Sequence, residues 1–122
     1  MTSPFTFFDL RTLDIGAARR FYADLLGWTS AELDVGPTPI PFFVDADGPW
    51  AGFTELAPDD ERRPQWIPYV TVASVAHSLA LACDLGATVI KDVTDIGVGL
   101  LAVVNDPSGA TFVLWQDVPG PA

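Results

Sequence analysis

Residues 10–27, LRTLDIGAARRFYADLLG, and residues 70–86, VTVASVAHSLALACDLG, follow the same plan. Each stretch predicts the end of a short apolar strand, a polar helix cap, an amphipathic helix and a closing glycine. The two stretches begin about sixty residues apart, which is half of the chain. A repeat of this size predicts two similar modules in one pseudo-symmetric domain, with a seam or cup between them.

The first predicted helix has a clear beginning and a clear end. The carboxylate of Asp14 can accept the amide hydrogens of the first turn, and Gly27 can adopt the positive φ that often ends a helix. Between them, apolar side chains recur at helical spacing and predict one apolar face of the helix: Ala18, Phe21, Tyr22, Leu25 and Leu26. Ser74 and Gly86 take the same two roles in the second copy.

Strand-like segments flank each predicted helix and complete the order β-α-β-β-β. In the first copy they are Phe5–Arg11, Trp28–Leu33, Pro41–Asp45 and Gly52–Leu56. In the second copy they are Trp66–Val72, Ala87–Lys91, Leu100–Asn105 and Ala110–Gln116. We therefore expect a single domain, residues 1–122, with module one at about 4–57, a polar linker at 58–64 and module two at about 65–118.

Composition narrows the classes of function. The formal net charge is −10, with sixteen acidic and six basic residues, which opposes nucleic-acid binding. No apolar run is long enough to span a membrane, and no signal peptide is evident. The single cysteine, Cys83, excludes an intrachain disulfide and favours a cytoplasmic location. The acidic field could attract a cationic small molecule or could serve only solubility.

Three stretches resemble the vicinal oxygen chelate superfamily, which includes glyoxalase I, bleomycin-resistance proteins and extradiol dioxygenases. Leu13-Asp14-Ile15, followed by AARRFYADLLGW, is similar to the passage from the first strand into the first helix. Leu85-Gly86-Ala87 is similar to the end of the second helix. Asn105-Asp106-Pro107-Ser108-Gly109-Ala110, leading into FVLWQ, is similar to the closing hairpin. The resemblance implies an α+β fold in which two tandem β-α-β-β-β modules form an incompletely closed eight-stranded cup.

The resemblance also implies where a metal would be held in the metal-dependent members. The corresponding positions here are Phe7 and Ile67 on the first strand of each module, and Phe53 and Val113 on the last. None of these side chains can bind a divalent ion, and the one histidine, His77, lies on the second predicted helix. We therefore predict no metal and no other cofactor. Glu55 and Asp9 are the nearest replacements for metal ligands.

Aromatic side chains are expected to line the cup in place of the metal. The chain has four tryptophans and eight phenylalanines, and aromatic faces stack on flat ligands and attract cations. Many of these rings could equally be core. The candidate ligand-binding residues are Phe7, Asp9, Phe43, Trp50, Phe53, Trp66, Tyr69, Val113 and Trp115.

Two functions are consistent with these features. The first is a metal-independent small-molecule binding protein similar to the bleomycin-resistance type, which sequesters an aromatic or apolar ligand, neutral or cationic, such as an antibiotic. The second is a metal-free isomerase, cyclase or lyase with Glu55 as the base, assisted by Asp9 or Tyr69. Metal-dependent lyase or dioxygenase activity is not expected, so whether the protein is an enzyme stays open. The resemblance also implies a homodimer.

Overall fold

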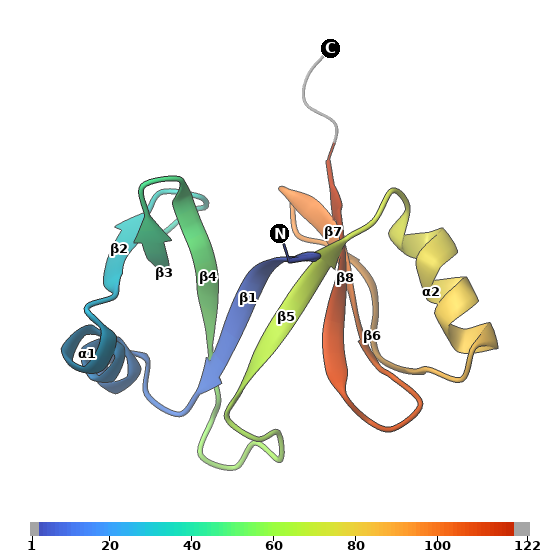
Figure 1. Ribbon diagram of the computed structural model, residues 1–122, viewed down its shortest axis with the longest axis horizontal. Helices are drawn as coiled ribbons and strands as arrows, with labels where there is room; N and C mark the ends of the chain where they lie inside the picture. The colour runs from blue at the N-terminus through green and yellow to red at the C-terminus, as the bar shows by residue number, and fades with distance from the viewer. Residues whose placement is uncertain (1–2, 119–122) are drawn as a thin grey trace. The chain divides into compact units, whose positions relative to one another are not determined.

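The computed structural model describes residues 3–118 of the 122-residue chain. The first copy of the repeat contains β1 (Phe5–Thr12), α1 (Ile15–Leu26), β2 (Thr29–Leu33), β3 (Ile40–Asp45) and β4 (Gly48–Glu55). The second contains β5 (Gln65–Thr71), α2 (Val75–Asp84), β6 (Thr88–Asp95), β7 (Gly99–Asn105) and β8 (Thr111–Asp117). Figure 1 shows this order running from blue to green and then from yellow-green to red.

The predicted fold class is confirmed. The eight strands form one sheet that is not closed into a barrel, since its order begins at β2 and ends at β6. With two helices, the fold is α+β. The described residues divide into two compact units, an N-terminal unit of residues 7–66 and a C-terminal unit of residues 3–6 and 67–118. No helix among the described residues is long and apolar enough to cross a membrane.

Both predicted helix caps are present. The Asp14 carboxylate accepts a hydrogen bond from the Ala17 amide at 3.0 Å, and the Ser74 hydroxyl accepts one from the His77 amide at 3.2 Å. Gly27 ends α1 with a φ of 71°, and Gly86 follows α2 with a φ of 102°. The repeated cap and glycine therefore have the physical roles that the sequence predicts.

The N-terminal unit packs α1 against one face of the strands β2, β3, β4 and β1, which lie in that order. The core of this helix-facing side consists of Leu10, Phe43 and Ala51, and Ala18 and Tyr22 of α1 pack against it. The rest of the predicted helix face is not buried, because Phe21, Leu25 and Leu26 are half or more exposed. The sheet therefore covers only part of the apolar helix face that the sequence predicts.

The C-terminal unit has the strand order β5-β8-β7-β6 and buries side chains on both faces of its sheet. On the face covered by α2, Val75 and Leu79 pack with apolar residues of β7 and β8. On the other face, Ile67, Leu101, Val103 and Val113 form a second buried cluster. Strands buried on both faces read as continuous apolar runs, and the run LLAVV in β7 shows this pattern.

Two strands are longer than the sequence suggests. β4 begins at Gly48 and not at Gly52, and β6 continues to Asp95 beyond the predicted end at Lys91. Pro49 pairs with Val44 although proline lacks an amide donor, and β6 keeps its pairing with β7 across two register shifts. The local sequence pattern did not indicate a strand at Pro49 or in the part of β6 that pairs irregularly.

Candidate functional site

Five residues of the N-terminal unit gather on the sheet face that α1 does not cover. β1 and β4 are parallel, and their register sets Asp9 beside Gly52 and Arg11 beside Thr54. Side chains at paired positions of neighbouring strands point to the same face. A Cβ at Gly52 would lie 3.6 Å from a ring carbon of Phe7, 3.7 Å from Oδ1 of Asp9 and 3.7 Å from a ring carbon of Phe42. We call Phe7, Asp9, Phe42, Gly52 and Thr54 the Asp9 cluster.

The carboxylate of Asp9 is the polar centre of this cluster. The Thr54 hydroxyl donates a hydrogen bond to its Oδ2 at 2.8 Å. Burial raises the pKa of the Asp9 carboxyl above its ordinary value, because the charged form loses hydration. The Thr54 hydrogen bond and the positive charges of Arg11 and Arg62 act in the opposite direction and do not cancel that rise. Asp9 therefore holds its proton more readily than an exposed aspartate.

The two rings of the cluster contact each other edge to face. The centroids of Phe7 and Phe42 are 6.4 Å apart and their planes are inclined at 63°. Gly52 has no side chain of its own, and a Cβ there would be in ordinary van der Waals contact with both rings. The arrangement combines two aromatic surfaces with one carboxyl group of raised pKa.

Four of the predicted ligand-binding residues lie elsewhere in the N-terminal unit. Phe43, Trp50, Phe53 and Trp66 belong to the helix-facing core, where Phe43 is fully buried. Phe53 pairs in register with Leu10, one position away from the Asp9–Gly52 pair, and so points to the opposite face from Phe7. The structure therefore does not bring Phe7 and Phe53 together, although the sequence analysis expected both in one cavity.

Glu55, the predicted base, contacts the beginning of α1. Its Oε1 accepts a hydrogen bond from the Ile15 amide at 3.1 Å, and the residue is exposed. A carboxylate in this position satisfies a free amide of the first turn and is favoured by the helix dipole. Glu55 pairs in register with Thr12 on the helix-facing side, away from Asp9.

The remaining three candidates lie together in the C-terminal unit. Tyr69 pairs in register with Val113, and the centroids of Tyr69 and Trp115 are 6.1 Å apart. All three pack with the buried cluster around Ile67, on the face away from α2. The indole nitrogen of Trp115 donates a hydrogen bond to Asp117 at 2.7 Å.

Within residues 3–118, no group of three or more His, Cys, Asp or Glu side chains lies close enough together to hold a metal ion. His77 is exposed on α2, and Cys83 is an exposed free thiol. The sequence names Asp9 and Glu55 as the nearest replacements for metal ligands. In the structure, Asp9 accepts a hydrogen bond from the Thr54 hydroxyl and Glu55 accepts one from the Ile15 amide.

Sequence reasoning missed Phe42, Gly52 and Thr54 as members of the site. The strand alternation in β4 could have indicated Thr54, since it lies two residues after Gly52. Placing Gly52 or Thr54 beside Asp9 also requires knowledge of the parallel register between β1 and β4. No local sequence pattern contains that information.

Comparison with known proteins agrees with this fold. The glyoxalase-like domain family matches residues 6–115. The chain is 34% identical over 104 residues to the anthracycline biosynthesis protein DnrV of Streptomyces peucetius, covering 85% of this chain and 38% of that protein. The curated relatives it matches are longer, and the chain spans between 38% and 43% of their length.

Two solved structures show the same fold at low identity. The hypothetical protein BH1468 of Bacillus halodurans is 13% identical with a TM-score of 0.68, covering 97% of this chain and 96% of that one. The methylmalonyl-CoA epimerase of Mycobacterium tuberculosis is 16% identical with a TM-score of 0.60, covering 98% and 93%. The chain belongs to the glyoxalase-like domain family and, with it, to the vicinal oxygen chelate superfamily.

Proposed function

We propose that the protein binds an organic small molecule with an aromatic or largely apolar body at the Asp9 cluster, without a divalent metal. The observation that carries this proposal is the placement of two phenylalanine rings and one carboxyl group around Gly52. Binding sites for small molecules combine apolar walls with a few polar groups that orient the ligand. The resemblance to the metal-dependent members places the metal-holding positions at Phe7, Phe53, Ile67 and Val113. All four of these side chains are apolar and cannot bind a divalent ion.

The chemistry of the cluster favours a flat ligand that carries a polar or cationic substituent. Each aromatic contact contributes about 0.5–1.5 kcal/mol beyond the area it buries. When ionised, Asp9 would attract a cationic group, and when protonated it would donate a hydrogen bond to a ligand oxygen. The relative DnrV is an anthracycline biosynthesis protein, and an anthracycline is a fused-ring aromatic compound of this kind. We therefore propose sequestration of such a compound, as in antibiotic resistance.

A titration with an anthracycline tests this function. The protein is first treated with EDTA to remove metal ions, and binding is then measured by the change in the fluorescence of the anthracycline. We expect saturable binding that added Mg²⁺, Ni²⁺ or Zn²⁺ does not strengthen. Phe7→Leu should weaken it about 3- to 10-fold through the loss of an aromatic surface. Gly52→Ala should also weaken it, because the new methyl group fits the fold at ordinary contact distances but occupies the space between Phe7, Phe42 and Asp9.

Phe21→Leu is the matched control for the titration. This ring is 57% exposed on α1, outside the Asp9 cluster, so its variant should bind as the wild type does. Binding that requires a metal, or that is equally strong in Gly52→Ala and the wild type, would contradict the proposal.

The raised pKa of Asp9 favours a second candidate, a metal-free isomerase, cyclase or lyase. A general acid or base works best when its pKa lies near the working pH, and burial moves Asp9 in that direction. Glu55 is engaged at the beginning of α1, so we assign the proton-transfer role in this alternative to Asp9. The anthracycline experiment separates the two functions, because an enzyme would convert a bound substrate while a sequestering protein would release it unchanged.

The pH dependence of stability reports the Asp9 pKa directly. Because the pKa of Asp9 is raised in the folded state above 3.8, its protonated form is the one that folding favours. Stability from this group is fully present below that value and is lost as the pH rises through the folded pKa. We expect Asp9→Asn to gain stability relative to the wild type with rising pH, measured by thermal unfolding between about pH 3.5 and 7.5. A difference that stays constant across this range would show that the pKa is not raised.

The homodimer and the cytoplasmic location also belong to this proposal and stay predictions. The exposed apolar side chains Phe21, Leu25 and Leu26 on α1 support an association surface. The single cysteine, exposed and free, suits a reducing compartment.

A further inference from the structure

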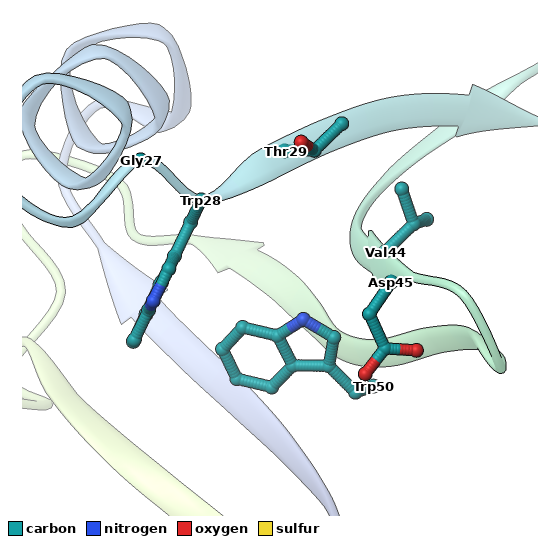
Figure 2. A pocket seen from close by; sticks show the side chains of 6 residues that line it. All are labelled: Gly27, Trp28, Thr29, Val44, Asp45 and Trp50. Atoms are coloured by element: carbon teal, nitrogen blue, oxygen red, sulfur yellow. The ribbon is translucent and has the colours of Figure 1, made fainter.

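A pocket lies in the N-terminal unit, formed by the end of α1 and the strands β2, β3 and β4. Its volume is about 410 Å³, and it is lined by Gly27, Trp28, Thr29, Val44, Asp45 and Trp50. Thr29 and Val44 pair across the β2–β3 ladder, and β4 supplies Trp50. Figure 2 shows the two indoles and the carboxylate of Asp45 from close by. We call this the Trp28–Trp50 pocket, and it shares no residue with the Asp9 cluster.

Both indoles of the pocket are fixed by other rings. The centroids of Trp28 and Trp50 are 4.7 Å apart and their planes are nearly perpendicular, at 89°. Tyr22 stacks on Trp28 at 5.1 Å and 11°, and Phe43 stacks on Trp50 at 5.4 Å and 17°. Because stacking neighbours hold the two rings in place, a ligand would meet a preformed aromatic surface and would lose little affinity to side-chain ordering.

Asp45 adds a negative charge to this aromatic surface. Its side chain lines the same pocket as Trp28 and Trp50 (Figure 2). Its Oδ1 accepts a hydrogen bond from the Asp47 amide at 2.8 Å, which fixes the carboxylate at the end of β3. The described ion pairs of this unit join Arg19 to Glu32 and Arg62 to Asp60, and among the described residues none gives Asp45 a cationic partner.

These features together select one class of ligand. Indole faces attract cations through the ring quadrupole, and tryptophan is the strongest of the aromatic side chains in this respect. A carboxylate beside them would repel an anion and would lose hydration to a neutral apolar group without compensation. A metal ion would need several oxygen, nitrogen or sulfur ligands, while the lining side chains offer only one carboxylate and the Thr29 hydroxyl beside two indole rings. We propose that the Trp28–Trp50 pocket binds an organic ammonium ion, with methylated ammonium groups favoured over primary ones.

Choline and its neutral carbon isostere, dimethylbutanol, test this proposal because they have the same shape and differ in charge. We would record the indole N–H signals of Trp28 and Trp50 by NMR during titration with each probe. Choline should shift both signals saturably, and dimethylbutanol should need a concentration at least roughly fivefold higher for the same shift. No saturable shift with choline, or equal affinity for the two probes, would overturn the assignment.

Asp45→Asn and Asp47→Asn form a matched pair of variants for the same titration. Asparagine at position 45 keeps a side-chain oxygen that can accept from the Asp47 amide, so the turn is retained. Asp45→Asn should weaken choline binding about fivefold or more and leave dimethylbutanol unchanged. Asp47→Asn removes the same charge two residues away, outside the pocket lining, and should change choline affinity by less than about twofold. If both variants weaken choline equally, the general acidic field and not the pocket is responsible. Failure of the anthracycline titration would leave this result unaffected, since no residue is shared.

Discussion

Replacing Phe43 by alanine is expected to lower the free energy of unfolding by about 3–5 kcal/mol. Its ring is fully buried and contacts the rings of Tyr22, Trp28, Trp50, Phe53 and Trp66. Removing it would leave a cavity at the centre of the helix-facing core, and several large rings would have to rearrange to fill it. Urea denaturation followed by far-UV circular dichroism measures the loss.

Phe21→Ala provides the control for this prediction. Phe21 precedes Tyr22 on α1 and is 57% exposed, so its removal should cost less than about 1 kcal/mol. Because the Phe43 ring also stacks on the Trp50 indole, Phe43→Ala should in addition weaken choline binding at the Trp28–Trp50 pocket. A loss of stability below about 1 kcal/mol in Phe43→Ala would show that this ring does not organise the core.

Gly99→Ala should destabilise the C-terminal unit by about 2–3 kcal/mol, at the upper end of the range for overpacking. Gly99 is buried at the start of β7, and an added Cβ would overlap the indole ring of Trp115. The same Cβ would lie 2.8 Å from the carbonyl oxygen of Gln116, so the backbone of β8 must move even if the ring swings away. Thermal and urea unfolding would show the loss, and tryptophan fluorescence would report the displaced ring.

Gly36→Ala is the matched control for this substitution. Nothing lies within 4 Å of a Cβ at Gly36, and its φ is not in the left-handed region. Alanine there should be neutral or stabilise the protein by up to about 1 kcal/mol, because it restricts the unfolded chain. If Gly99→Ala is equally well tolerated, the close packing of Trp115 over β7 is contradicted.

The helices and their caps could be predicted from sequence because the signals are local. Asp14 and Gly27 act within one helical turn of the residues that they serve, and so does Ser74. The apolar periodicity of α1 predicted a helix correctly but not which residues it buries. Ala18 and Tyr22 meet the sheet, while Phe21 and Leu25 do not, because the width of the contact depends on the partner strands.

The candidate site depended on information that is not local. Placing Phe7 and Asp9 beside Gly52 requires the register of two strands about forty residues apart, and a shift of one position turns every side chain to the other face. This is why Phe53 was expected in the cavity and lies in the helix-facing core instead. Trp28 and Asp45 were missed for the same reason, since their pocket forms only when β2, β3 and β4 are paired.

The most direct test of the proposed function is a crystal structure of the protein incubated with an anthracycline and a mixture of divalent metal ions. We predict ligand density against Phe7, Phe42 and Gly52, with Asp9 contacting a polar group of the ligand and no metal bound there. A metal ion held by Asp9 or Glu55, or a ligand bound away from the Asp9 cluster, would contradict the account.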